Sequence, residues 1–341
     1  MRKNCGLRIE EQEVGADLRR AVMDGGSVGG NEVAGLTVIA RSIGSRAVTA
    51  LHPGATGRVL ATFSRFCHLV TEKGDIVILA WDWAERGPLT VLLEAGPAGD
   101  LWSLLATSTA FQVTMGGLWL SRRNSPPVRV DLSGAAHWES RLHWEALQPR
   151  SEQIRSSAKT VYRVMRQAQG RRSDLRWESR LSQASGAVLK ARRARDWNEL
   201  RAAIHNLCGL GEGLTPQGDD WLAGWLLGTR LVESSGPSDW ASEVLGALVL
   251  DAASERTTVL SRAFLACAAA GEAPESWHLL LGQMAQDPMD ECALDGATRR
   301  IISHGATSGR AMLEGFLAGF GSPSTPRPAI RGGNTVSFAM E

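Results

Sequence analysis

The chain has 341 residues, of which 43% are hydrophobic and 21% charged, and its formal net charge is +1. These values are typical of a soluble protein with room for two cores, and they give no reason to expect a nucleic-acid or membrane partner. The first residues carry charges without an apolar segment, so no signal peptide and a cytoplasmic location are predicted. Five cysteines without a Cys-x-x-Cys pair favour reduced, mostly buried thiols, and seven histidines without metal spacing argue against structural zinc. No cofactor is predicted, and the sequence leaves open whether a metal joins Asp219 and Asp220.

Residues 1–30 are polar and rich in glycine and are expected to be poorly ordered. The next region, 31–135, alternates short β-branched segments with turns, which predicts a small β-barrel or sandwich-like domain. The predicted strands are 35–41, 57–71, 75–81, 88–94 and 127–133. One helix is expected near 98–109, and the uncharged stretch 101–120 is interpreted as a buried helix with an adjoining strand.

After residue 137 the hydrophobic periodicity becomes helical, so 137–320 is predicted to be an α-helical domain. The expected helices are 138–147, 151–169, 173–193, 196–207, 216–233, 238–253, 255–271, 275–286, 290–303 and 308–320. The tail 321–341, rich in Pro, Gly and Ser, is expected to be disordered. The predicted fold class is therefore α+β.

The stretch 150–201 carries 14 Lys/Arg against five Asp/Glu. One interpretation is a face for an acidic partner or RNA. The arginines spread around helices without interleaved aromatic residues, which favours a solvated face or a docking face for another subunit.

An internal repeat is the most informative feature of the chain. Aligned on Gly218 and Gly309, which are 91 residues apart, two segments follow the pattern G-x-x-x-L-x-G-x-L-x-G. Each begins as a loop that holds a Thr and continues as a helix with glycines four apart on one face. Such faces allow two helix backbones to approach closely, and approximate two-fold symmetry should bring the two helix starts together, where free N–H groups favour an anion.

The loop before the first of these helices is a candidate ligand site. Thr215 is expected to be the N-cap, with Pro216 as the first helical residue. Alternate glycines before it, among them Gly211 and Gly213, permit positive φ and close approach to a ligand. The alternative is a glycine-rich connection without a ligand, since the loop is neither a Walker A loop nor a dinucleotide fingerprint.

Asp219 and Asp220 lie near the start of an apolar helix, and Asp220 shares a face with Gly224 and Gly228. A carboxylate in a close-packed seam is costly unless it meets a cation, a metal or a ligand rich in donors. Either Asp220 forms a buried pair with Arg310, or these groups hold a substrate amide or carboxylate.

Further polar residues are expected to complete the same site. The helix predicted at 255–271 opens with Arg256, Thr257 and Thr258, and Ser261 shares a face with Thr258. Either hydroxyl alone could bond back to the i−4 carbonyl, but both together beside an Arg favour a third wall of the site. His304, which precedes the second helix, is either a structural donor or a general base. The candidate catalytic residues are Asp219, Asp220 and His304. The candidate substrate- or anion-binding residues are Gly211, Gly213, Thr215, Gly218, Arg256, Thr257, Thr258, Ser261, Gly305, Thr307, Ser308 and Arg310.

Three segments carry a resemblance to a known family. They are GLGEGLTPQGDDWLAGWLLG (209–228), RTTVLSRAFL (256–265) and HGATSGRAMLEGF (304–316). In this order they resemble the AllH family, which is similar to one subunit of oxamate carbamoyltransferase. A strand from Phe63 to Leu69 and a Gly-Pro turn at 87–88 resemble the β-domain of that family more loosely, so the resemblance covers about 31–320. The loop before the last helix departs from the family pattern. The family commonly has a second hydroxyl residue there, and in this chain Thr307 and Ser308 supply the hydroxyl pair one position further along, after Ala306.

The resemblance implies a cytoplasmic subunit that acts with AllF/FdrA-like and AllG-like subunits, one of them similar to an acyl-CoA synthetase-like protein. Together they would transfer a carbamoyl group between oxalurate and phosphate, giving oxamate and carbamoyl phosphate in allantoin and purine breakdown. Which subunit holds the active site is not implied. The alternative is a non-catalytic scaffold, or a sensor of a ureide or phosphate anion.

The sequence also predicts how an anion would bind. The N–H groups near Thr215, Thr307 and Ser308, with the guanidinium groups of Arg310 and Arg256, are expected to face one pocket. Phosphate or carbamoyl phosphate should then raise the melting temperature, and Arg310→Ala should remove that effect.

Overall fold

The structure, a computed structural model, describes residues 35–94, 101–122, 125–168, 175–232 and 242–321. The segment 1–30 and nearly all of 321–341, for which disorder was predicted, lie outside these residues. Residues from Leu36 onward cluster as one compact unit. The division of the chain at 135–137 therefore stays a prediction about its domain organisation.

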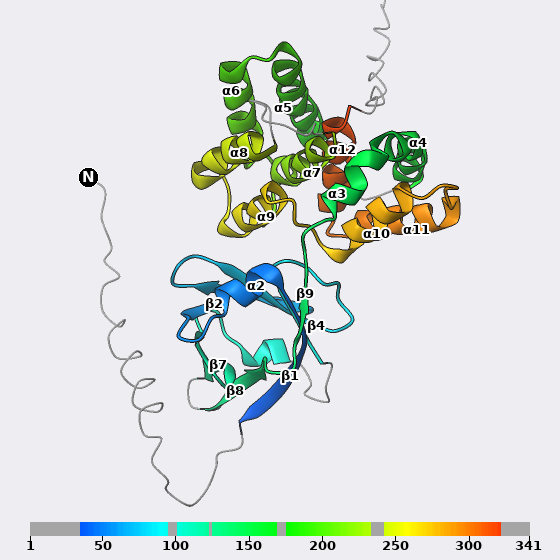
Figure 1. Ribbon diagram of the computed structural model, residues 1–341. Coiled ribbons are helices and arrows are strands. Elements are labelled where there is room, and N and C mark those ends of the chain that lie inside the picture. The colour runs from blue at the N-terminus through cyan, green and yellow to red at the C-terminus, as the bar shows by residue number, and fades with distance from the viewer. Residues whose placement is uncertain (1–34, 95–100, 123–124, 169–174, 233–241, 322–341) are drawn as a thin grey trace, which may run out of the picture. The chain divides into compact units, whose positions relative to one another are not determined.

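Eight strands form a closed barrel, which confirms the predicted β-rich N-terminal region (Figure 1). The strands are β1 (Leu36–Gly44), β2 (Thr56–Thr62), β3 (Phe66–Thr71), β4 (Ile76–Trp81), β5 (Thr90–Leu93), β6 (Ala110–Thr114), β7 (Gly117–Arg122) and β8 (Ser125–Asp131). Their order is β5-β4-β3-β2-β6-β7-β8-β1, and β1 pairs with β5 to close the barrel. A ninth strand, β9 (Ala136–Trp138), runs parallel to the end of β1.

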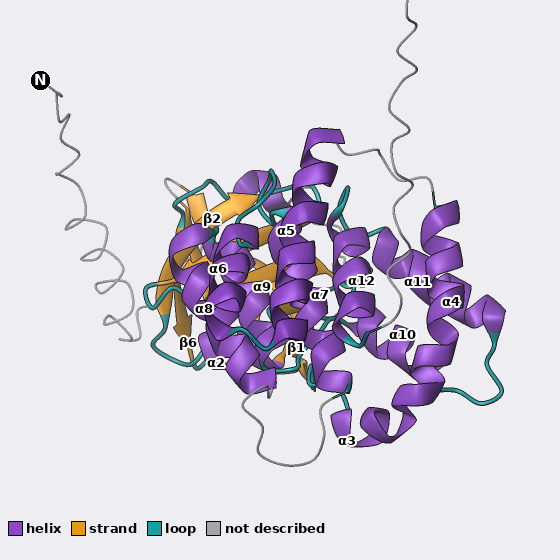
Figure 2. Cartoon of the chain, turned by 90° about the horizontal axis from the view of Figure 1, so that it is seen from above, coloured by secondary structure: helices purple, strands orange, loops and turns teal. Residues whose placement is uncertain are grey.

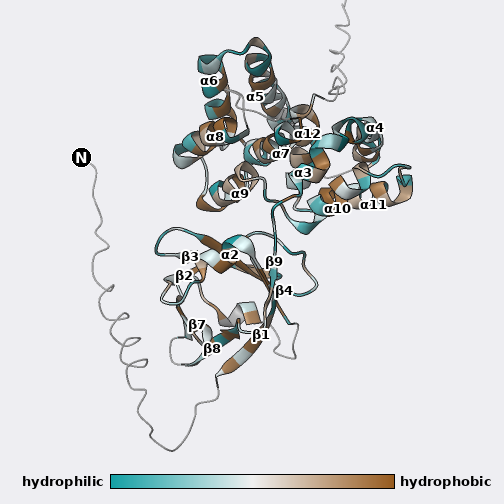
Figure 3. Ribbon diagram, viewed as in Figure 1, coloured by the Kyte–Doolittle hydropathy of each residue, from teal (hydrophilic) through white to brown (hydrophobic). Residues whose placement is uncertain are grey.

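Some barrel strands bury alternate side chains, whereas β3, β4 and β5 bury consecutive ones. In β6, Phe111 and Val113 are buried while their neighbours are half-buried. Side chains such as Val59, Leu79 and Leu93 are completely buried in the barrel core, and Figure 3 colours the hydrophobic residues along the strands.

Three predictions in this region are wrong. In place of the helix near 98–109 the described residues contain a single 3-10 turn, η1 (Leu101–Leu104), and the stretch 101–120 holds most of two strands, β6 and β7, instead of one. The segment 57–71 is a hairpin rather than one strand, because the chain turns between Thr62 and Phe66. A short helix, α2 (Ser45–Ala50), was not predicted.

The second half is helical, as predicted, and its helices are shown from above in Figure 2. They are α3 (Trp144–Leu147), α4 (Ser151–Gln167), α5 (Leu175–Ala194), α6 (Trp197–Leu207), α7 (Gln217–Leu231), α8 (Ser242–Arg256), α9 (Val259–Ala269), α10 (Glu275–Met284), α11 (Glu291–Ile302) and α12 (Ser308–Gly319), with a 3-10 turn, η2 (Gln148–Arg150), after α3. The helix predicted over 138–147 is wrong for all but its last turn, because β9 occupies its start. The overall class, α+β, is confirmed.

Several arginines of the basic stretch hold helices together. Arg192 of α5 donates to the carbonyl oxygen of Gly319 at 3.0 Å and lies over the ring of Trp225, and Arg163 of α4 pairs with Glu291 at 3.1 Å. Part of the positive charge in this stretch is therefore used within the fold.

The cysteine prediction is confirmed for three of the described thiols. Cys67, Cys208 and Cys267 are free and buried, whereas Cys292 is exposed. Burial raises the pKa of Cys67 and of Cys267 to about 12 and raises that of Cys208 as well, so these thiols stay protonated at neutral pH. Within the described ranges, none of the helices combines the length and hydrophobicity needed to cross a bilayer.

Candidate functional site

The two repeat helices, α7 and α12, pack against each other through their glycines, as the sequence predicts (Figure 1). A methyl group added at Gly224 would lie 1.8 Å from the carbonyl oxygen of Met312. One turn later, a methyl group at Gly228 would lie 2.2 Å from the carbonyl oxygen of Phe316. No side chain fits in these gaps, because the two backbones are in direct contact.

The contacts are reciprocal. Gly315 corresponds to Gly224 in the repeat, and a methyl group there would lie 1.9 Å from the carbonyl oxygen of Trp221. Trp221 in turn corresponds to Met312, because 312 − 91 = 221. Each repeat therefore makes the same contact with the other, which is the arrangement that a two-fold axis produces. The prediction of approximate two-fold symmetry is confirmed for this helix pair.

The two helices run in the same direction, so their N-terminal ends lie at the same end of the pair. Contacts that ascend together along both helices, 224 with 312 and then 228 with 316, fix this direction. At that end the hydroxyl groups of Thr215 and Ser308 lie 3.1 Å apart and share a hydrogen bond. Both residues are half-buried, so the pair is close to solvent.

The predicted N-cap role of Thr215 is wrong by one residue. Pro216 occupies the N-cap of α7 in an extended conformation, and no side chain caps this helix. Thr307, the N-cap of α12, likewise makes no side-chain cap bond. The Thr215 hydroxyl is therefore available to Ser308. Backbone carbonyl oxygens accept some of the first N–H groups instead, from Gly218 to Leu210 at 2.8 Å and from Gly309 to His304 at 3.1 Å.

The glycines of the loop before α7 have positive φ angles, as expected for a chain that reverses within a few residues. Gly209, Gly211 and Gly213 have φ of 73°, 126° and 91°. Gly218 is required for another reason, because a methyl group there would lie 2.0 Å from the carbonyl oxygen of Leu207. In the second repeat Gly305 has φ of 63° and lies beside Ser308. These glycines fix the course of the two loops.

Asp219 is buried and fully engaged by donors from the surrounding loops. Its Oδ1 accepts the backbone N–H of Gly209 at 2.7 Å, and its Oδ2 accepts the hydroxyl groups of Ser261, at 2.7 Å, and of Thr257. Three segments of the chain, the glycine loop, α7 and the start of α9, are therefore joined at one carboxylate.

Asp220 differs from its neighbour in having an unused acceptor. The side chain is buried, with the residue 8% exposed, and its Oδ2 has no hydrogen-bond partner. Burial raises the pKa of this carboxyl from 3.8 to about 8; a hydrogen bond with the Ser308 side chain lowers it, and the negative charge of Asp219 raises it. At neutral pH this carboxyl is therefore largely protonated.

The residues that open α9 connect it to the glycine loop. The helix begins at Val259, later than predicted, and Thr258 is its N-cap, accepting the N–H of Ser261 at 3.0 Å. The Thr258 hydroxyl donates to the carbonyl oxygen of Leu214 at 2.7 Å. Thr257, Thr258 and Ser261 thus support the loop and Asp219.

The charged candidates Arg310, His304 and Arg256 have other contacts. Arg310 donates to the carbonyl oxygen of Met165 at 2.8 Å and to Glu314 at 3.3 Å. Arg256 is exposed at the end of α8, and its carbonyl oxygen lies against Gly209. Among the contacts of the described residues, neither guanidinium group bonds to Asp220, so the Asp220–Arg310 pair, one of the two alternatives, is not formed.

His304 lies 3.1 Å from the carboxylate of Glu85, in the turn after β4. Burial lowers the pKa of His304; Glu85 opposes this effect and Arg300 adds to it. Glu85 also accepts the N–H of Ser276 at 3.2 Å. Nothing in the sequence pairs a residue of the β4–β5 turn with the start of α12, because contacts between residues so distant depend on the tertiary fold.

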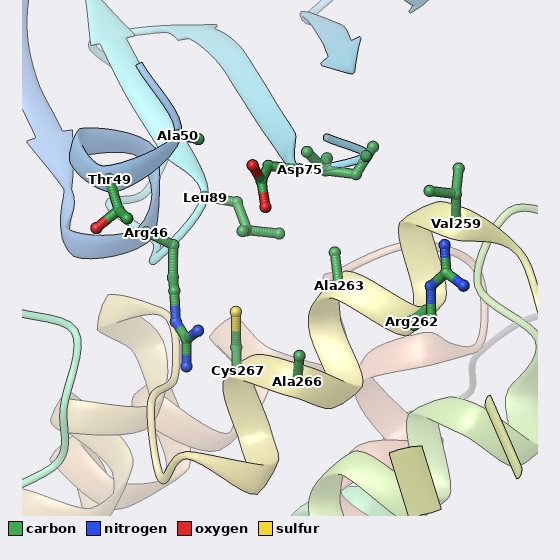
Figure 4. Close-up of a pocket in the computed structure, with 12 residues that line it drawn as sticks. Arg46, Thr49, Ala50, Asp75, Leu89, Val259, Arg262, Ala263, Ala266 and Cys267 are labelled. Atoms are coloured by element: carbon green, nitrogen blue, oxygen red, sulfur yellow. The ribbon is translucent and has the colours of Figure 1, made fainter. Parts of the chain in front are cut away.

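A separate cavity of about 230 Å³ lies between α9, α2 and the first residues of β4 (Figure 4). Arg46 and Arg262 line it at opposite ends, and Arg46 is bound to Glu272 through two hydrogen bonds of 2.9 and 3.0 Å. None of the candidate site residues predicted from the sequence lines this cavity.

The structure thus brings Thr215, Ser308 and Asp220 together at one end of a symmetric helix pair. Residues 207–320, which contain both helices, match the family model described as oxamate carbamoyltransferase subunit AllH. No curated protein and no solved structure matches the chain. Residues 31–206 lie outside the matched range, so the resemblance noted there stays a prediction. The matched range spans α7, α9 and α12 and contains the three motifs in order, which supports assignment of the chain to the AllH family.

Proposed function

We propose that this chain is a subunit of an oxamate carbamoyltransferase-related complex and that the junction of α7 and α12 binds a reactant. The observation that carries this proposal is the unpartnered Oδ2 of Asp220, buried beside the Thr215–Ser308 hydroxyl pair inside the family-matched segment. A buried carboxyl oxygen without a donor is costly to folding, and such groups are concentrated at functional sites.

The proposed reaction is the transfer of a carbamoyl group between oxalurate and phosphate. A phosphate oxygen attacks the carbamoyl carbon, the bond from that carbon to the oxamate nitrogen breaks, and the nitrogen takes up a proton. The products are oxamate and carbamoyl phosphate. AllF/FdrA-like and AllG-like chains are the proposed partners.

The site has groups suited to such reactants. The starts of α7 and α12 supply the positive ends of two helix dipoles, which favour a phosphate or carboxylate. Their N–H groups are in part already used, since Gly218 donates to Leu210 and Gly309 to His304. The hydroxyls of Thr215 and Ser308 can donate or accept, and Asp220 offers an acceptor for an N–H group. Asp219 holds the surrounding loops in place through its three hydrogen bonds.

A second candidate is a subunit that binds a ureide or phosphate without catalysing transfer, as a sensor or scaffold. The contacts of Arg310 favour it. Stabilising the charge of a transferring phosphoryl or carbamoyl group often uses an arginine, and this one is held by Met165 and Glu314. In this case the reacting groups would come from another subunit.

The test is co-purification of the chain with the products of its genomic neighbours, followed by an assay of oxalurate phosphorolysis. Asp220→Asn preserves shape and is compared with Asp251→Asn on α8, where the carboxylate is exposed and pairs with Arg201. If the site is catalytic, the Asp220→Asn complex should still assemble but should have lost turnover. Unchanged turnover would favour the scaffold, and ligand binding by the isolated chain without any effect on turnover would favour the sensor.

A further inference from the structure

The helix register places Asp220 opposite Ser308. Gly224 lies against Met312 and Gly228 against Phe316, so the paired residues differ by 88 in each case (312 − 224 and 316 − 228). One helical turn earlier the same register pairs 220 with 308. Asp220 and Ser308 therefore face each other at the N-terminal end of the α7–α12 contact surface, the seam, one turn before its first glycine contact.

This first position is polar and incompletely bonded. The Ser308 hydroxyl lies 3.1 Å from that of Thr215. The N–H of Gly209 and the hydroxyls of Thr257 and Ser261 donate to Asp219. Oδ2 of Asp220 is left without a donor although it is buried. A bound molecule that supplies an N–H would satisfy it, and the half-buried hydroxyl pair lies on the way to solvent.

The symmetry of the repeat is broken at this position. The counterpart of Asp220 is Ala311 (220 + 91), and the counterpart of Ser308 is Gln217 (308 − 91). The two-fold scaffold thus carries a carboxyl acceptor on one side only, so a small planar ligand at the helix starts has a preferred orientation.

We propose that Oδ2 of Asp220 accepts an N–H of a ligand amide or carbamoyl group and that this residue makes the site prefer such a group to a carboxylate of the same shape. The inference rests on the proposed function, since it assigns a specificity role within the same site. Asp219 is a positioning residue for it, because it fixes the loop and the helix that carry Asp220.

The protonation state of Asp220 sets the conditions of the test. Burial raises the pKa of this carboxyl to about 8, and the other titratable group that acts on it is Asp219. Above that pH the carboxylate accepts an N–H and repels a ligand carboxylate, whereas below it the protonated group can also donate to a carboxylate. Binding is therefore best compared at about pH 9, where the ionised form dominates.

Oxamate and oxalate form a matched pair of probes, because they differ only in the replacement of an amide NH2 by a carboxylate oxygen. Binding of each is measured by calorimetry with the full chain and with the co-purified complex. The wild type is expected to bind oxamate at least about tenfold more tightly than oxalate, because oxamate gives the buried Asp220 carboxyl a hydrogen-bond donor and oxalate does not. Asp220→Asn should lose this preference, because its amide can donate to oxalate, while Asp251→Asn should retain it.

The inference is overturned if wild type binds the two probes equally, if neither probe binds the chain or the complex, or if Asp220→Asn keeps the preference. A melting curve establishes that the variant is folded, and Ser308→Ala provides a second variant, which should weaken oxamate binding without reversing the preference. Turnover is read separately. A complex without phosphorolysis but with an Asp220-dependent preference would contradict the proposed reaction only, and turnover without that preference would contradict the inference only.

Discussion

The hydroxyl groups of Thr215 and Ser308 lie 3.1 Å apart although 93 residues separate them in the chain. Each residue comes from the start of one copy of the repeat, so this hydrogen bond records the meeting of the two helix N-terminal ends. It depends on the glycines further along the pair, because a wider separation of α7 and α12 would also separate the two hydroxyls. Packing in the seam and chemistry at its end are therefore linked.

The first prediction concerns the seam. Gly224→Ala should lower the free energy of unfolding by about 1–3 kcal/mol, because the new methyl group would lie 1.8 Å from the Met312 carbonyl oxygen and must push the helices apart. Gly296→Ala in α11 is the matched control, since nothing lies within 4 Å of its added methyl group and alanine favours a helix. Denaturant unfolding measures both, and a neutral Gly224→Ala would contradict the close packing.

The second prediction concerns Asp219. Asp219→Ala removes the acceptor of three donors and should destabilise the protein by at least about 2 kcal/mol. A double-mutant cycle with Ser261→Ala should give a coupling of about 1 kcal/mol or more. The exposed Arg201–Asp251 pair, treated in the same way, should give a coupling close to zero. Additive effects of Asp219→Ala and Ser261→Ala would show that the short contact between them contributes little.

The third prediction is a pH dependence of stability. The folded pKa of Asp220, about 8, lies above its ordinary value of 3.8, so between these values the native state holds a proton that the unfolded chain has released. Stability should therefore fall as pH rises through this window. Asp220→Asn cannot titrate, so its advantage over wild type should grow from about pH 4 to about pH 8, by at most about 1.4 kcal/mol per pH unit. Unfolding curves at several pH values measure it, and a constant difference would contradict a raised pKa.

The sequence was sufficient to predict the helix pair because its signal is local and periodic. Glycines four residues apart, such as Gly224 and Gly228, define one face of a helix whatever surrounds it, and the repeat indicates which second helix it meets. The short β-branched segments separated by turns were also sufficient to predict a barrel or sandwich of strands, though not which of the two. The uncharged stretch 101–120 was misassigned because an apolar run fits a buried helix and barrel strands equally well.

The site was predictable only in part. The sequence indicated that Asp220 would lie in the seam, but it could not indicate that Arg310 would bond to Met165 and Glu314, since that choice depends on how α4 packs against α12. Asp219 and Asp220 are adjacent and chemically identical, and only the positions of Gly209, Thr257 and Ser261 distinguish a satisfied carboxylate from an unsatisfied one. Tertiary contacts made by other helices determine these differences.

The last prediction concerns phosphate. The sequence predicts that Arg310 holds the anion, but its guanidinium group bonds to Met165 and Glu314. We therefore expect the anion to bind at the starts of α7 and α12. Phosphate should raise the melting temperature of the full chain, because the positive ends of the α7 and α12 dipoles and the hydroxyls of Thr215 and Ser308 meet at the helix starts. Ser308→Ala and Thr215→Val should each reduce the shift, whereas Arg310→Ala should largely retain it.

The phosphate effect should also depend on Asp220. Below about pH 8 this carboxyl is mostly protonated and does not repel the anion, so the shift in melting temperature should be larger at about pH 7 than at about pH 9. Asp220→Asn should remove most of that pH dependence, because its side chain carries no charge at either pH. Phosphate itself also loses a proton between these pH values, but this affects wild type and variant equally. A shift that disappears in Arg310→Ala and survives in Ser308→Ala would instead place the anion at the guanidinium group, away from the helix starts.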